Sequence, residues 1–167
     1  EQKALQQELA EMAARDELTG LYNQRALRVR LEAAVQTARS HNRALSLVSI
    51  DLDNFKQCND QYGHPVGDKV LCHAGQVIME QIRSGDTGFR NGGDEFCALL
   101  DSAPAEIAER VGERIRQAFA KGECYGTSMS IGVAELQPSM DAMALLKTAD
   151  EAMYRAKSSG KNSICVA

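Results

Sequence analysis

The sequence predicts an α+β fold in which helices surround a mixed central β-sheet. Amphipathic segments with a helical period alternate irregularly with short apolar runs typical of strands. Two of these runs, at 87–90 and 95–100, are separated only by Asn-Gly-Gly-Asp, which is typical of a tight hairpin turn. A hairpin among helix-covered strands indicates a mixed sheet and not a doubly wound parallel one.

The size and composition limit the function classes. A chain of 167 residues fits one domain, and a net charge of −4 does not favour a surface for nucleic acid. No apolar run approaches the roughly 20 residues that cross a bilayer, so no membrane contact by this domain is expected. The five cysteines are scattered without a CxxC pair, which argues against a disulfide framework or structural zinc and favours reduced thiols in the cytosol.

The first 14 residues predict a separate helix. Leu5, Leu9 and Met12 form a narrow apolar stripe on a polar segment, which favours the end of a coiled-coil linker from an upstream domain. A frayed terminal helix is the alternative. Because the chain starts with Glu1 and not Met, we expect a piece of a longer protein, with a signalling helix at 1–14 and the globular domain at 15–167.

The remaining elements follow from apolar periodicity. A loop is predicted at 63–67, Asn23 as a helix N-cap, and Gly160 as the residue that ends the last helix. Helices are predicted at 23–40, 55–62, 69–82, 104–121 and 141–158, and strands at 44–51, 87–90, 95–100, 126–135 and 163–166.

Two acidic sites are candidates for chemistry. Asp51 and Asp53 end the predicted central strand, and Asp94 and Glu95 lie at the hairpin tip. Carboxylates at the ends of adjacent strands can converge on Mg²⁺, which prefers oxygen ligands. The alternative is a turn residue at 94 and a strand-end cap at 51. The two glycines before Asp94 would let a ligand approach the backbone closely.

The segment 91–96, Asn-Gly-Gly-Asp-Glu-Phe, resembles the signature of the GGDEF family, the diguanylate cyclases. Four further blocks resemble the family's motifs in the same order, at 16–23, 51–68, 130–134 and 149–162. The resemblance covers about residues 15–165. It implies a fold akin to the polymerase palm and the class III nucleotide cyclases.

The resemblance also implies the reaction and its partners. Two GTP molecules would be joined into cyclic di-GMP with release of two pyrophosphates, at the interface of a homodimer in which each domain holds one GTP. The implied cofactor is Mg²⁺, with Mn²⁺ as an alternative. Because the reaction needs GTP, the domain would be cytoplasmic, whether the parent protein is soluble or membrane-anchored.

The resemblance assigns roles to individual residues. The implied metal site consists of Asp51, Asp94, Glu95 and the backbone carbonyl of Leu52, with the three acidic residues also catalytic and Glu95 a candidate base. The implied substrate-binding residues are Phe55, Lys56, Asn59, Asp68, Gly92, Gly93, Lys157 and Lys161. Among them, Asn59 and Asp68 match guanine-reading positions.

The two lysines match positions that contact the outer phosphates. By themselves they fit a solvated helix end favoured by the helix dipole. The family more often has arginine where this chain has Lys161, so the bidentate fork is lost while the charge is kept.

A second motif precedes the hairpin turn. Arg83 and Asp86 form an RxxD tetrad whose distance from Gly92 resembles the family's inhibitory product-binding site, with Arg90 as a further candidate. By itself the tetrad fits a helix-end ion pair. The intact acidic positions favour an active diguanylate cyclase with product inhibition. The alternatives are a catalytically silent module that binds cyclic di-GMP or GTP, and a structural dimerisation module.

Overall fold

A five-stranded mixed sheet forms the centre of the computed structural model, which describes residues 1–167. The spatial order is β2-β3-β1-β4-β5, and only the β4–β5 pair is parallel. This confirms the predicted mixed sheet and hairpin. The strands are β1 (Leu45–Asp53), β2 (Thr87–Arg90), β3 (Glu95–Asp101), β4 (Ser128–Glu135) and β5 (Ile164–Val166).

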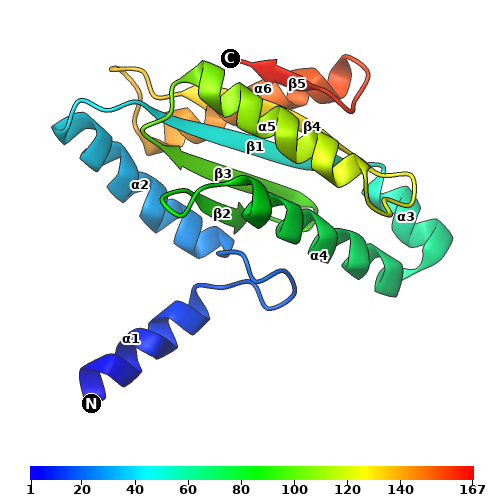
Figure 1. The fold of residues 1–167 in the computed structure, drawn as a ribbon, viewed down its shortest axis with the longest axis horizontal. Coiled ribbons are helices and arrows are strands. Elements are labelled where there is room, and N and C mark those ends of the chain that lie inside the picture. Colours follow the sequence, from blue (N-terminus) through cyan, green and yellow to red (C-terminus); the bar gives the residue numbers. More distant parts are fainter.

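Helices cover both faces of the sheet (Figure 1). One buried cluster joins Val48 and Ile50 of β1 to helices α4 and α5, and the other joins Leu45 and Leu47 to α2 and α6. The alternation of side chains along β1 therefore separates the two cores. The helices are α1 (Gln2–Ala13), α2 (Gln24–Ser40), α3 (Phe55–Tyr62), α4 (His64–Gln81), α5 (Ala105–Ala120) and α6 (Ala142–Ser158).

On the face of β1 that is directed toward α6, the side chains change from apolar to polar along the strand. All nine of its residues are buried, yet Leu45 and Leu47 are followed on the same face by Ser49, Asp51 and Asp53. Buried polar side chains need partners or a ligand. The last part of β1 is thus the place where the fold departs from an ordinary apolar core.

Helix α6 lies directly against the backbone of β4. A Cβ atom on Gly132 would lie 2.1 Å from the backbone N of Met153 and 2.2 Å from the carbonyl O of Ala149. Gly132 is also the register partner of Ser49, whose Oγ donates a 2.5 Å hydrogen bond to Oδ1 of Asp150. These contacts fix the position of α6 over β1 and β4.

The loop predicted at 63–67 is wrong, because α4 already begins at His64. Pro65 is tolerated in the first helical turn, where no backbone donor is needed, and Gly63, with φ 89°, separates α3 from α4. Gly67 lies within α4, and its lack of a side chain leaves room for Asn59, since a Cβ there would lie 1.8 Å from Oδ1 of Asn59. The glycine serves helix packing and not a loop.

The other elements agree with the prediction to within about two residues. Asn23 caps α2, since its side chain accepts from the backbone N of Ala26. Gly160 follows α6 with φ 123°. All five cysteines are free, and Cys58 and Cys97 are buried.

Helix α1 buries none of its side chains, and Leu5, Leu9 and Met12 are exposed. It contacts the domain through Glu11, which pairs with Arg30 at 3.1 Å and accepts from the Tyr22 hydroxyl at 3.2 Å. The boundary after residue 14 and the coiled-coil role remain predictions. None of the helices combines the length and apolarity needed to cross a membrane.

Replacing Gly132 by alanine should destabilise the domain by at least about 2 kcal/mol, because the new methyl group overlaps backbone atoms that cannot rotate away. Urea unfolding measures the free energy. Gly85→Ala is the matched control, since a Cβ there meets nothing within 4 Å. Equal stability of the two variants would contradict this account of α6.

Candidate active site

Two carboxylates face each other at the end of the central strands. Asp51 of β1 and Glu95 of β3 are register partners, and the backbone N of Leu52 donates to the carbonyl O of Asp94 at 3.1 Å beside them. The pair is therefore of the narrow, non-hydrogen-bonded type, in which Cα atoms lie about 4.5 Å apart. The strand end and the hairpin tip converge, as the sequence predicted.

Lys157 of α6 supplies the positive charge nearest to this pair. Its ammonium group forms a close ion pair with Oδ2 of Asp51. Burial lowers the pKa of Lys157, but the hydrogen bond and charge of Asp51 outweigh burial and raise it. Lys157 is half-buried and directed into the site, unlike a solvated helix end.

The positive charge of Lys157 does not balance the negative charges of the neighbouring carboxylates. Burial, reinforced by the charge of Asp94, raises the pKa of Asp51 despite its bond to Lys157. Desolvation, followed by the charges of Asp51 and Asp150, raises the pKa of Glu95. The carboxylates would therefore be stabilised by an added cation.

The donor set fits a hard divalent cation. Oδ1 of Asp51 is buried and has no hydrogen-bond partner. No group of three or more His, Cys, Asp or Glu side chains converges closely enough to hold a metal by itself. Mg²⁺ commonly uses one or two carboxylates and takes its other ligands from water and substrate phosphates. The site fits that mode of binding and not an all-protein cage.

The hairpin turn presents open backbone beside Glu95. The Gly92 backbone lies under the Glu95 carboxylate, with Oε2 3.3 Å from an added Cβ, whereas a Cβ on Gly93 meets nothing within 4 Å. Neither glycine has a positive φ. The turn backbone does not itself require glycine at these positions, and their lack of side chains leaves space for a ligand.

Arg90 holds this turn in place. Its guanidinium donates to the carbonyl O of Gly93 at 2.8 Å and of Gly92 at 3.2 Å, and it pairs with Asp16 at 3.1 Å. Asp16 precedes α2 and accepts two further bonds from Thr19. Arg90 therefore connects the opening motif to the hairpin, a role that the sequence reasoning missed.

The two candidate guanine-reading residues lie close together. The Asn59 carboxamide of α3 packs over the backbone of Gly67, and Asp68 follows on the exposed side of α4. Oδ1 of Asn59 is buried without a hydrogen-bond partner. Phe55 packs beside them against the core. The carboxamide oxygen of Asn59 is therefore free to accept a hydrogen bond from a ligand.

Positive charges gather near the first turn of α3. Lys161 donates from Nζ to Oδ1 of Asn54, the N-cap residue, at 2.9 Å, and the exposed Lys56 lies within the first turn. Ammonium groups beside the positive end of a helix dipole repel that end. An anion between them would be stabilised by both.

Asp53 differs from Asp51 although the two share one face of β1. It is fully buried, and its oxygens accept from Ser128 at 2.7 Å, Ser130 at 2.6 Å and the backbone N of Asn162 at 3.0 Å. Its hydrogen bonds make it a structural carboxylate. Its hydrogen-bond partners come from distant parts of the chain, so the sequence alone does not distinguish Asp53 from a carboxylate that binds a metal.

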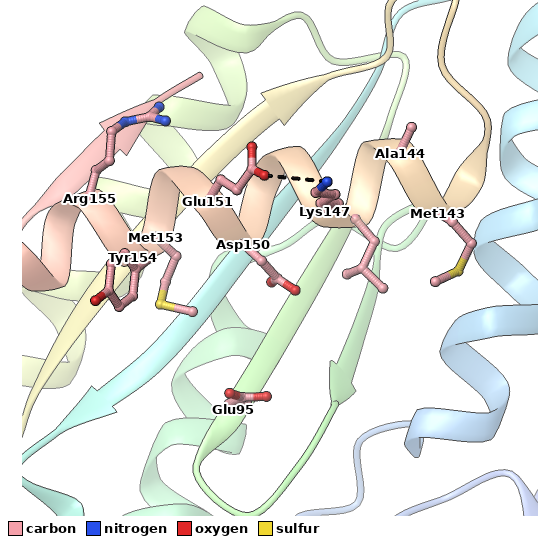
Figure 2. A pocket seen from close by; sticks show the side chains of 10 residues that line it. Glu95, Met143, Ala144, Lys147, Asp150, Glu151, Met153, Tyr154 and Arg155 are labelled. Carbon is pink, nitrogen blue, oxygen red and sulfur yellow. Dashed lines mark ion pairs between the residues drawn. The ribbon is translucent and has the colours of Figure 1, made fainter.

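A groove of about 990 Å³ runs along α6 and reaches Glu95 (Figure 2). The Asp150 side chain projects from the helix toward the strand that carries Glu95. Burial raises the pKa of Asp150, although its bond from Ser49 opposes the shift. Asp150 lies within the block at 149–162, and the sequence predicted no role for it.

Arg83 and Asp86 pair with each other at 3.3 Å, in agreement with the ion-pair alternative. The Asp86 side chain is only 2% exposed and also accepts from the backbone N of Asp101 at 3.1 Å. Arg83 is 63% exposed, and its Nη1 makes no hydrogen bond. The adjoining groove of about 460 Å³ is lined by Arg15 and Arg30, which the sequence reasoning missed, but not by Arg90.

Comparison with known proteins decides the family. A family model described as "Diguanylate cyclase, GGDEF domain" matches residues 13–163. The chain belongs to the GGDEF family. Diguanylate cyclase DgcS of Shewanella oneidensis is 40% identical over 93% of this chain and 53% of its own, and DgcM of Escherichia coli K12 is 38% identical over 100% and 42%. This GGDEF domain thus spans about half the length of the curated relatives it matches.

Solved structures agree with the fold of this GGDEF domain. The coiled coil and GGDEF domain of DgcB from Caulobacter crescentus, in complex with c-di-GMP, has a TM-score of 0.93 at 28% identity and covers 99% of this chain and 91% of its own. SiaD of Pseudomonas aeruginosa, in complex with its activator SiaC, has a TM-score of 0.91 at 32% identity and covers 99% of this chain and 66% of its own. The expected resemblance to the palm-like nucleotide cyclase fold is confirmed.

The contact between Asp16 and Arg90 predicts a pH dependence of stability. Burial raises the pKa of Asp16, but the Thr19 hydrogen bonds and the Arg90 charge outweigh it and lower the pKa below its ordinary 3.8. A lowered pKa adds stability above the ordinary value, and this stability is lost as pH falls through the folded-state value. Asp16→Asn should cost about 1 kcal/mol at neutral pH.

Urea unfolding at several pH values checks this expectation. The difference in stability between the wild type and Asp16→Asn should narrow as pH falls below 3.8. A difference that stays constant through the acid range would contradict the assigned ion pair.

Proposed function

We propose that this GGDEF domain is a diguanylate cyclase that condenses two GTP molecules into cyclic di-GMP and releases two pyrophosphates. Each domain of a homodimer would hold one GTP. The observation that carries the proposal is the Asp51–Glu95 pair beside an open glycine turn, with Oδ1 of Asp51 buried and unpartnered. The names of the relatives and the complex of DgcB with c-di-GMP support it.

The chemistry is a phosphoryl transfer carried out twice. The 3′-hydroxyl oxygen of one GTP forms a bond to the α-phosphorus of the other, the bond from that phosphorus to the pyrophosphate oxygen breaks, and the hydroxyl proton leaves. Such reactions depend mainly on positioning and charge neutralisation. A single domain positions only one nucleotide, so the interface of two copies completes the site.

Asp51, Asp94, Glu95 and the carbonyl of Leu52 are the candidate ligands of Mg²⁺, or of Mn²⁺ in its place, and water and substrate phosphates would complete the coordination. When bound, the metal neutralises phosphate charge and polarises the reacting oxygens. Glu95 lies at the sheet surface beside the open turn and is the candidate to accept the hydroxyl proton. Gly92 and Gly93 leave the backbone accessible to the nucleotide.

The remaining substrate contacts fall into two groups, one for the guanine and one for the phosphates. Asn59 and Asp68 offer an amide and a carboxylate to the guanine edge, beside Phe55. Lys56 and Lys161 supply cations toward the outer phosphates at the first turn of α3, and Lys157 supplies one from its place beside Asp51. GTP use implies a cytoplasmic location for the domain.

The alternative is a catalytically silent GGDEF domain that binds cyclic di-GMP or GTP and signals to a partner. No acidic position or glycine of the signature is replaced in this chain, which favours the enzyme. The complex of SiaD with its activator SiaC is an example of a relative with a protein partner.

Incubating the chain with GTP and Mg²⁺ should yield cyclic di-GMP, resolved by chromatography, with specific activity that rises with protein concentration because two domains must meet. Glu95→Gln should lower turnover at least about a hundredfold without unfolding the domain. Glu80→Gln, an exposed carboxylate on α4, is the control. Binding of GTP without any product would favour the silent module.

The exposed guanidinium of Arg83 is proposed to bind the product and inhibit the enzyme together with Asp86. Arg90, the further candidate, would act indirectly by holding the hairpin turn, because it does not line the adjoining groove. Arg83→Ala should raise the concentration of cyclic di-GMP needed for half-inhibition by about tenfold, since a charged bidentate contact is lost. Arg39→Ala, an exposed arginine of α2, should leave inhibition unchanged. Equal inhibition of both variants would leave Arg83 and Asp86 as a structural ion pair.

A further inference from the structure

The loop after α6 has an unusual backbone. Gly160 has φ 123°, and the next two residues, Lys161 and Asn162, have φ 63° and 44°. Two consecutive residues with side chains in the left-handed region are unfavourable. Such a conformation persists only where the surroundings enforce it, and it is frequent at functional sites.

Two elements far apart in sequence enforce it at Asn162. From β1, the buried Asp53 accepts the backbone N–H of Asn162 at 3.0 Å. From α5, Nη1 of Arg116 donates to Oδ1 of Asn162 at 2.8 Å. Arg116 is itself held by Glu113, through bonds of 2.6 and 2.9 Å to its two carboxylate oxygens. Asn162 therefore has a fixed partner on each side.

The held loop determines where Lys161 lies. Its ammonium group reaches Oδ1 of Asn54 at the first turn of α3, although the residue as a whole is exposed. An exposed lysine on an unrestrained loop would lose both backbone and side-chain conformational entropy on binding an anion. A loop fixed beforehand removes part of that cost.

We propose that Arg116 is a positioning residue for the nucleotide: it holds Asn162 so that Lys161 is presented to the outer phosphates. The inference rests on the proposed function, in which Lys161 contacts those phosphates. Arg116 lies on α5, in a groove that it shares with Glu109, Glu113 and Asn162, and it does not line the groove that reaches Glu95. It acts through the loop and not by touching substrate.

A double-mutant cycle tests the proposal with the full chain, GTP and Mg²⁺. Lys161→Ala should raise KM for GTP about tenfold and Arg116→Gln about threefold to fivefold, with little change in kcat. The double variant should show no larger KM than Lys161→Ala alone, because Arg116 acts through Lys161. Arg116→Lys keeps a positively charged donor group, so its increase in KM should be smaller than that of Arg116→Gln.

Arg114→Gln is the matched control. Arg114 lies on the same helix, but its guanidinium donates to the carbonyl O of Gln81 at 2.5 Å, away from the loop. It should leave KM unchanged. Hydrogen exchange at the Asn162 amide gives a readout independent of turnover, and exchange should accelerate in Arg116→Gln but not in Arg114→Gln.

The outcomes separate this inference from the proposed function. A raised KM in Lys161→Ala with an unchanged KM in Arg116→Gln, or fully additive effects, would overturn the positioning role while the cyclase activity stands. An unchanged KM in Lys161→Ala would overturn both the phosphate contact and the positioning role. If the wild type forms no product, the proposed function fails, and unaltered Asn162 exchange in Arg116→Gln would then also reject the loop restraint.

Discussion

Electrostatic repulsion between Asp51 and Glu95 is the constraint around which the site is arranged. Like charges directly opposite on antiparallel strands destabilise a sheet. The fold accommodates the pair at the end of β1, where Lys157 neutralises one carboxylate and the hairpin turn leaves the other at the surface. Lys157 can do so only because α6 lies tightly on Gly132. The packing of α6 on β4 thus determines how the charge of Asp51 on β1 is neutralised.

Much of the fold was predictable because it follows from local chemistry. Apolar periodicity and the Asn-Gly-Gly-Asp turn located nearly every element, and these signals depend on residues close together in sequence. The exception at 63–67 is instructive. Pro65 and Gly67 are typical loop residues, but one occupies a first helical turn and the other makes room for Asn59. Only the packing of α3 against α4 distinguishes these cases.

The chemistry of the site was less predictable from the residues alone. Asp51 and Asp53 are two positions apart on one strand face, yet one has an unpartnered oxygen and the other is saturated by Ser128, Ser130 and Asn162. Those partners lie 75 to 109 residues away in the chain. For the same reason, the contact of Arg90 with Asp16 and that of Arg116 with Asn162 were not predicted, because each joins residues far apart in the chain. The family motifs mark important positions but do not show which residues bind a ligand and which residues hold the binding residues in place.

Helix α1 has a kinetic consequence. Because it buries no side chain against the domain, its apolar stripe of Leu5, Leu9 and Met12 is available to a second helix without loss of any internal contact. Two domains tethered through such a pair would meet at an effective concentration in the millimolar range, far above that of separate molecules. A change in the helix pairing would then alter how often two bound nucleotides face each other, with no change at any reacting group.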